Sequence, residues 1–113
     1  MKKTGCSVVL VTTRSLLEAK KIAKALLNKK LCACINIIPK INSMYVWKGT
    51  LHDEKEVLLV IKTKKELFKQ VSTEVKRLHS YTVPEVIALP ILEGNKAYLD
   101  WIAKECLKVR QGS

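Results

Sequence analysis

The sequence twice places a short apolar stretch directly before a helix start, and this repeat limits the fold more than any other feature. Residues 6–12 are apolar and β-branched, which predicts a short buried strand. SLLE at positions 15–18 has the serine and glutamate spacing of a capping box, so we predict a helix start there. The apolar residues that follow recur at the spacing of one helix face: Ala19, Ile22, Ala23, Leu26 and Leu27.

The second unit repeats this order. Residues 52–62 contain the continuous apolar run VLLVI at 57–61, which predicts a second long strand. TKKE at 63–66 has the same spacing, so we predict a second capping box. The helix behind it has an apolar face formed by Leu67, Phe68, Val71, Val75 and Leu78.

The segments between and after these units complete the topology. We predict a strand over residues 31–47, with Pro39 at a bulge or an edge, and a fourth strand over residues 83–92. Tyr98, Trp101, Ile102 and Val109 predict a C-terminal helix. The order β-α-β-β-α-β plus a helix predicts an α+β, ferredoxin-like split β-α-β fold. We expect one domain over residues 1–113, which is an ordinary domain length.

The two middle strands are longer than this fold requires. They are expected to project beyond the sheet as a two-stranded ribbon, joined by a turn at Lys48-Gly49. A projecting ribbon exposes unpaired backbone groups along its edges unless another chain covers them. Met44, Tyr45, Val46 and Trp47 lie near the expected tip, so we predict a homo-oligomer.

Targeting signals and cysteine usage favour a cytoplasmic protein. The first apolar run, residues 8–11, is shorter than the roughly 7–15 residues of a signal-peptide core. No run approaches the roughly 20 residues of a membrane span. The four cysteines are therefore expected to be reduced thiols.

The net charge of +11 raises the question of polyanion binding. The lysines are spread along the whole chain, and the strand EVLLVIKT at 56–63 has none of the aromatic residues that stack on RNA bases. We therefore expect no nucleic acid partner. A basic nucleic-acid-binding module is kept as an alternative function.

The cysteines of LCACINIIP at 31–39 raise the question of a metal site. In a strand, Cys32 and Cys34 would share one face. A structural zinc site needs four ligands, but there is no second cysteine pair, and His52 and His79 are single and far apart. Small core residues are the preferred interpretation, with contact between one thiol and a soft metal as the alternative. His79 fits either a helix end or a metal or proton site.

Two further sets of residues suggest binding sites. The turn TTRS at 12–15 joins a strand to a helix, where free backbone N–H groups bind anions. It supports an alternative enzymatic function, an acylphosphatase-like phosphate hydrolase in which Arg14 holds phosphate and Asn36 orients a water. The second set lies either on separate surfaces or along one shared cleft: Tyr45, Trp47, Glu56, Lys62, Tyr81 and Glu85. We expect this cleft at a subunit interface, where it would bind a small ligand or, weakly, a divalent metal.

Five motifs in this order resemble the CutA divalent-cation-tolerance family over nearly the whole chain. They are ACINI at 33–37 with Pro39, SMYVWKG at 43–49, EVLLVIKT at 56–63, HSYTVPE at 79–85 and GNKAYLDW at 94–101. The resemblance implies a ferredoxin-like homotrimer, similar in architecture to PII-type signalling proteins, with the long central strands pairing between subunits. It also implies a non-catalytic role in the response to metal ions, with copper the metal most discussed.

The resemblance also bears on metal ligands. The copper ligands proposed for the family are a cysteine late in the first strand and two adjacent histidines. In this chain these positions hold Val11 and Leu78-His79, so His79 alone matches. Cys34 matches a cysteine common in the family that is also proposed to contact metal. We therefore predict Cys34 and His79 as metal ligands, with copper or another divalent metal as a non-obligatory ligand.

Overall fold

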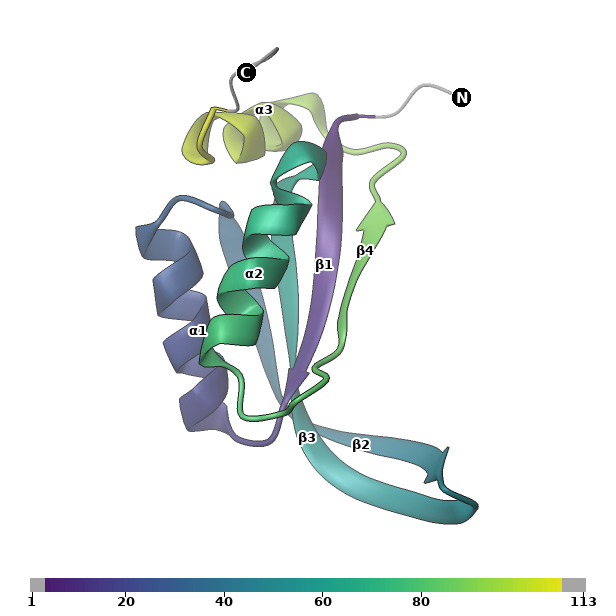
Figure 1. The fold of residues 1–113 in the computed structure, drawn as a ribbon. Helices are drawn as coiled ribbons and strands as arrows, with labels where there is room; N and C mark the ends of the chain where they lie inside the picture. The colour runs from purple at the N-terminus through teal and green to yellow at the C-terminus, as the bar shows by residue number, and fades with distance from the viewer. Residues whose placement is uncertain (1–3, 109–113) are drawn as a thin grey trace.

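Four antiparallel strands form one sheet in the order β2-β3-β1-β4, and α1 and α2 cover one of its faces (Figure 1). This arrangement is seen in a computed structural model that describes residues 4–108. The elements are β1 (Cys6–Thr13), α1 (Leu16–Asn28), β2 (Cys34–Trp47), β3 (Thr50–Lys64), a 3-10 turn (Lys65–Leu67), α2 (Phe68–Leu78), β4 (Val86–Pro90) and α3 (Lys96–Glu105). The predicted α+β fold and its element order are confirmed.

The core lies between the sheet and the two long helices. Val9 and Val11 of β1 are fully buried, and they pair across the sheet with Ile61 and Leu59 of β3, which are also fully buried. Because successive strand residues point to opposite faces, these positions all face the helices. Leu26 of α1 is likewise completely buried. α3 lies at the end of the sheet opposite the projecting ribbon.

The two predicted capping boxes have different outcomes. At α1 the Ser15 hydroxyl accepts a hydrogen bond from the Glu18 backbone N–H at 3.1 Å, as predicted. The second box is wrong, because Thr63 is a buried residue of β3 and its hydroxyl donates to the Leu31 carbonyl at 2.6 Å. A buried hydroxyl must find a partner, and this one finds it across the fold. α2 therefore begins after a 3-10 turn, without a side-chain cap.

Several predicted strand and helix ends also need correction. β2 begins at Cys34 rather than at position 31, so Cys32 is not on a strand face with Cys34. Cys32 is only 2% exposed and belongs to the core, whereas Cys34 is partly exposed. β4 is Val86–Pro90, shorter than predicted, which leaves residues 79–85 as a loop. α3 ends at Glu105, and Val109 lies outside the described residues.

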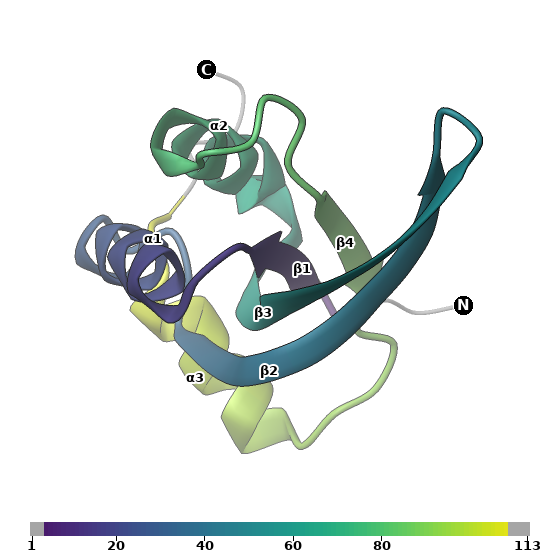
Figure 2. The same ribbon diagram turned by 90° about the horizontal axis from the view of Figure 1, so that it is seen from below.

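β2 and β3 continue past the sheet as a curved, two-stranded ribbon (Figure 2). Lys48 and Gly49 form its turn with positive φ angles of 51° and 78°, the conformation of a tight hairpin whose twist matches the strands. The predicted ribbon is thus confirmed. Among the described residues, no helix is long and apolar enough to cross a membrane.

Candidate functional site

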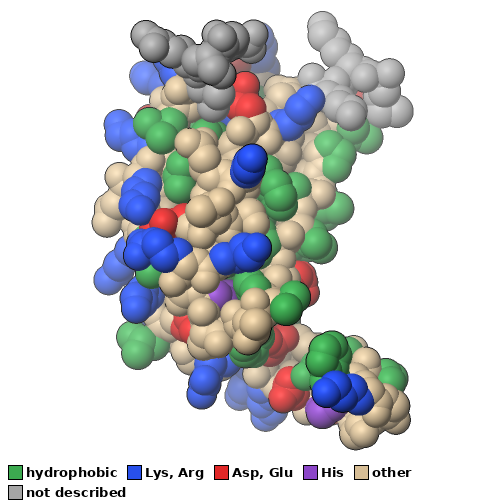
Figure 3. Space-filling view, in the orientation of Figure 1, with side chains coloured by type: hydrophobic (Ala, Val, Ile, Leu, Met, Phe, Trp, Pro, Cys, Tyr) green, Lys and Arg blue, Asp and Glu red, His purple; other side chains and the backbone are tan. Residues whose placement is uncertain are grey.

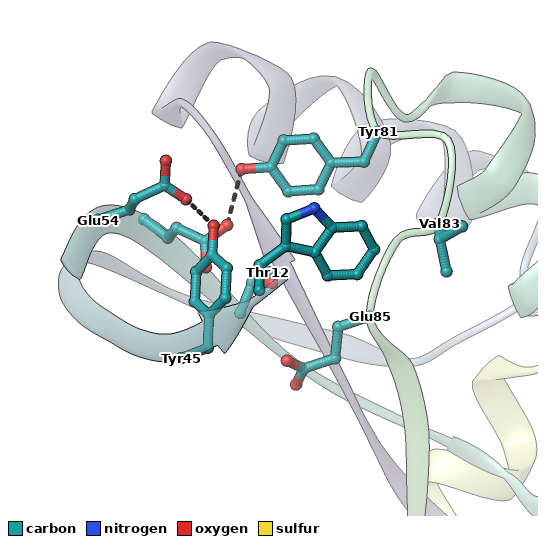
Figure 4. A pocket seen from close by; sticks show the side chains of 8 residues that line it. Thr12, Tyr45, Glu54, Tyr81, Val83 and Glu85 are labelled. Carbon is teal, nitrogen blue, oxygen red and sulfur yellow. Dashed lines mark hydrogen bonds between the residues drawn. The ribbon is translucent and has the colours of Figure 1, made fainter. Parts of the chain in front are cut away.

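A cleft of about 390 Å³ lies where the ribbon leaves the sheet (Figure 4). One wall comes from the ribbon, with Tyr45, Trp47, Glu54 and Glu56. The opposite wall comes from the loop between α2 and β4, with Tyr81, Val83 and Glu85, while Thr12 contributes from the end of β1. The cleft therefore joins three segments that are far apart in the sequence.

A β-bulge in β2 directs the aromatic side chains into this cleft. Ile38 pairs with Leu58 and Ile41 pairs with Glu56, so β2 has one residue more than β3 between these pairs. Before the bulge the even-numbered residues of β2 face away from the helices, and after it the odd-numbered residues do. Tyr45 therefore shares a face with Glu54 and Glu56, which a regular strand would not allow. Pro39, at the predicted bulge, lies inside this irregularity.

The second wall is held in place by His79. The ring atom Nδ1 accepts a hydrogen bond from the Tyr81 backbone N–H at 3.0 Å. Nε2 must then carry the proton, and it donates to the Thr12 carbonyl at 2.7 Å. The His79 side chain is completely buried. Because both ring nitrogens are engaged with the backbone of cleft residues, His79 positions the loop against the sheet.

Two tyrosine hydroxyls bind the carboxylates of β3. Tyr81 donates to Glu56 at 2.7 Å, and Tyr45 donates to Glu54. Burial and the bond to Glu56 raise the pKa of Tyr81 above its usual value, and the bond to Glu54 raises the pKa of Tyr45. Burial, together with the nearby Glu56 charge, raises the pKa of Glu85. The cleft thus concentrates negative charge that its own residues only partly balance.

The rest of the molecule has the opposite charge. Lys and Arg side chains gather over α1 and α2 in the space-filling view (Figure 3). The helix layer, residues 14–30 and 65–78, holds ten basic and three acidic residues, a net charge of +7 within a chain of +11. Within the described part of the chain, the residues that line the cleft include three carboxylates and no basic side chain. It is an acidic site in a basic protein.

The structure joins five of the six predicted cleft residues: Tyr45, Trp47, Glu56, Tyr81 and Glu85. Lys62 lies outside the cleft. It is six residues from Glu56 along β3, about 20 Å at about 3.3 Å per residue, and it hydrogen-bonds Asn36.

The two predicted metal ligands are not brought together within the chain. Cys34 pairs with Lys62 at the far end of β3, whereas His79 contacts Thr12, which pairs with Leu58. Across residues 4–108, no three His, Cys, Asp or Glu side chains are grouped closely enough to hold a metal ion. The alternative hydrolase function requires Arg14 and Asn36 to lie in one site. Among the described residues these two side chains neither contact each other nor line the same pocket. Arg14 lies beside Lys55 and Glu56, and Asn36 bonds Lys62.

Three lining residues were not predicted: Thr12, Glu54 and Val83. Glu54 was detectable from the sequence, because it lies two residues from Glu56 on the same strand and so shares its face. Thr12 could not be predicted from the sequence, because its place in the cleft depends on which end of β1 lies beside the ribbon. Val83 was assigned to a strand, and nothing in its local sequence indicates a cleft.

Comparison with known proteins identifies the family. The profile of the family described as CutA1 divalent ion tolerance protein matches residues 7–105. This chain belongs to that family. A CutA divalent-cation tolerance protein from Thermus thermophilus is 50% identical over 95 residues, which cover 84% of this chain and 92% of that protein. The human protein CutA is 45% identical over 85% of this chain, but the match spans only 54% of the human protein.

Solved CutA1 structures share the fold closely. The CutA1 crystal structure from Oryza sativa has a TM-score of 0.90 at 40% identity, and the match covers 95% of this chain and 98% of that one. The Thermus thermophilus structure has a TM-score of 0.87 at 46% identity, covering 89% and 98%. A protein named chloroplastic CutA 1, from Oryza sativa, is 45% identical over 84% of this chain and 54% of that protein.

Proposed function

We propose that this CutA-family chain is a non-catalytic homotrimer that takes part in divalent-cation tolerance by binding a ligand in the acidic cleft. The observation that carries the proposal is the charge of the cleft. Three of the ten acidic residues of the chain line it, and among residues 4–108 no basic residue does. Concave sites with a few convergent polar groups are where ligands bind. The family descriptions name a tolerance rather than a reaction, which supports a role without catalysis.

The homotrimer is supported by the sheet face that points away from the helices. Along β1 and β3 this face presents Val8, Leu10, Leu58 and Val60, which are only partly buried in the single chain. On β4 it presents Ile87 and Leu89, which are 49% and 51% exposed. A contiguous apolar face of this kind is typical of a subunit interface. The projecting ribbon, with Val46 68% exposed, gives a second surface for a neighbouring subunit.

The oligomer has a direct test. Light scattering of the wild-type protein should give three times the chain mass, and Leu10→Glu should reduce that mass because it places a charge on the outer face. Leu17→Glu is the matched control, since Leu17 lies on α1 and is 81% exposed. A monomeric wild-type protein would contradict the homotrimer.

Metal binding at Cys34 and His79 is proposed as a separate and weak property. Cys34 is the one cysteine of the chain that is not buried, so its thiol is accessible to copper. His79 must first give up its hydrogen bonds to Thr12 and Tyr81. We expect a Cu(II) titration against a competing chelator to show weak binding that Cys34→Ser reduces. Loss of tight, submicromolar binding in His79→Ala would instead make the imidazole a dominant ligand.

The four cysteines bear on where in the cell the protein is found. We place the protein in the cytoplasm, because its four cysteines are all free thiols and such thiols persist in reducing compartments. Fractionation of cells that express the chain, with detection by an antibody, tests this assignment. Recovery in a membrane or exported fraction would contradict it.

A further inference from the structure

The helix layer lies on the side of the sheet that the proposed subunit contacts do not use. α1 and α2 cover one face of the sheet, whereas the apolar positions proposed for the interface point from the other face, and the ribbon projects past the end of the sheet (Figure 1). The net charge of +7 on this layer therefore stays on the outside of the proposed homotrimer. A strongly charged outer surface attracts partners of the opposite charge.

The positive charge of the helix layer is not balanced by its own acids. Lys29 and Arg77 both pair with Glu74, which is buried. Glu18 turns inward, and its side chain is only 13% exposed. Of the three carboxylates in the layer, Glu66 alone is then left to balance the other eight basic residues. Within residues 4–108 these eight have no ion-pair partner, and all of them are exposed: Arg14, Lys20, Lys21, Lys24, Lys30, Lys65, Lys69 and Lys76.

The spacing of the lysines on α1 differs from that of an ordinary soluble surface. Soluble surfaces usually mix both signs, and a helix gains stability where opposite charges lie three or four residues apart. On α1, Lys20 and Lys24 lie four residues apart and Lys21 and Lys24 lie three apart, so like charges repel along its exposed side. An acidic chain that lies against the helix relieves this repulsion. The charge of the layer is therefore matched to an acidic partner.

Two hollows at the ends of the seam between α1 and α2 add apolar contacts to this charge. Each hollow has leucine side chains on its walls and basic side chains beside them. The hollow near the start of α1 has a volume of about 280 Å³, and its lining includes Leu17, Leu78, Arg14 and Lys21. The hollow near the end of α1 has a volume of about 450 Å³, and its lining includes Leu31, Leu107, Lys29 and Lys69. A partner that fits both features carries carboxylates and apolar side chains.

An acidic protein segment fits the helix layer better than RNA or a membrane does. Phe68 is the one aromatic residue of the layer, and it packs against the core, so no ring is offered to an unpaired base. A helix that binds a bilayer inserts its apolar face. The apolar face of α1, which includes Ile22 and Leu26, is instead buried in the core. The hollows accept individual side chains, which a polypeptide supplies.

We propose that the helix layer docks an acidic segment of a partner protein along the seam between α1 and α2. Carboxylates of the segment pair with Lys20, Lys21 and Lys24, and its apolar side chains enter the two hollows. α1 has 13 residues and is about 20 Å long at about 1.5 Å per residue, so a helical segment of similar length spans the seam. The inference does not depend on the ligand of the acidic cleft, because no cleft residue belongs to the helix layer.

Fluorescence anisotropy with a labelled acidic peptide tests this docking surface. The probe is a fluorescein-labelled peptide of five Glu-Glu-Leu repeats, and the control peptides are five repeats of Glu-Glu-Ser and of Lys-Lys-Leu. The wild-type protein should bind the probe saturably at low salt, bind the serine peptide more weakly and leave the lysine peptide unbound. Lys21→Glu should weaken binding of the probe by about tenfold, and Leu17→Ser by about threefold. Lys104→Glu is the matched control, because it makes the same charge change at an exposed residue of α3, outside the layer.

Three outcomes would overturn the proposal. Equal weakening by Lys21→Glu and Lys104→Glu would mean that the affinity follows net charge alone. Tighter binding of labelled oligouridine, or of vesicles that contain phosphatidylserine, would assign the surface to RNA or to a membrane instead. Absence of peptide binding by a protein with native circular dichroism would remove the docking surface. None of these outcomes bears on the acidic cleft, so the inference and the proposed function fail separately.

Discussion

Replacing Glu74 with glutamine should destabilise the protein at neutral pH and have a smaller effect in acid. Glu74 of α2 is 6% exposed and receives three charged contacts. Arg77 donates to its two oxygens at 3.0 and 2.8 Å, and Lys29, the residue after α1, lies at 3.0 Å. Hydrogen bonds from Arg77 and Lys29 lower the pKa of this carboxyl from 4.5 to about 2.

The expected size of the effect follows from this pKa. The difference between 4.5 and about 2 corresponds to about 3 kcal/mol of stability at about 1.4 kcal/mol per pH unit. The Lys29 and Arg77 side chains are 54% and 59% exposed, so solvent screens the attraction, and we expect about 1–2 kcal/mol. Because the pKa of Glu74 is lower in the folded state than in the unfolded state, the ionised carboxylate stabilises the folded protein above pH 4.5. This stabilisation is lost as the pH falls toward 2.

The assay is denaturant unfolding of the wild type and of Glu74→Gln at fixed protein concentration, at about pH 7 and pH 3. By linkage, the difference between the two proteins should shrink by roughly half or more at the lower pH. Glu66→Gln is the control, because Glu66 is an exposed residue of the 3-10 turn and should change stability by less than about 0.5 kcal/mol. A deficit of equal size at both pH values would refute the electrostatic explanation.

Three further predictions concern the core, the cleft and the thiols. Leu59→Ala should lower the free energy of unfolding by about 2–5 kcal/mol, because Leu59 is fully buried. Leu17→Ala should lower it by less than about 0.5 kcal/mol, because Leu17 is exposed on the surface of α1. Equal losses would contradict the assigned core. Because the pKa of Tyr81 is raised, an absorbance titration should show one tyrosine that is still neutral well above pH 10. Tyr81→Phe should remove the ionisation at the highest pH, and a titration that this variant leaves unchanged would contradict the assignment. A thiol reagent should modify one cysteine rapidly, and Cys34→Ser should abolish this phase, whereas a fast phase that persists would place the accessible thiol elsewhere.

Most of the fold could be predicted from periodicity, because its elements are set by local patterns of burial. The run at residues 57–61 lies in β3, and the Ser15 cap begins α1 as predicted. Thr63 shows the limit of this approach. Its spacing to Glu66 fits a capping box, but its hydroxyl is used by the carbonyl of Leu31, a partner 32 residues away. A local sequence pattern cannot predict a hydrogen bond between residues that are so far apart in the sequence.

The residues of the cleft could be predicted where the alternation of side chains along a strand decides which of them share a face. Trp47 and Glu56, which are expected along one cleft, both line it, and their shared face depends on the bulge beside Pro39. Lys62 and Glu56 flank the apolar run of β3, but the cleft does not extend as far along this strand as Lys62. His79 remains a predicted metal ligand, and in the fold it positions the loop through two backbone hydrogen bonds. One of these bonds is to Thr12, 67 residues away, so this part of the role is not encoded near His79 in the sequence.

The most direct test of the central claim is growth under copper stress. Cells that lack their own CutA protein would express the wild type, Glu56→Gln combined with Glu85→Gln, or Cys34→Ser, at matched protein levels. If the cleft is the site through which this protein supports cation tolerance, the wild type and Cys34→Ser restore growth, and the double cleft variant does not. Full rescue by a folded double cleft variant would contradict the account.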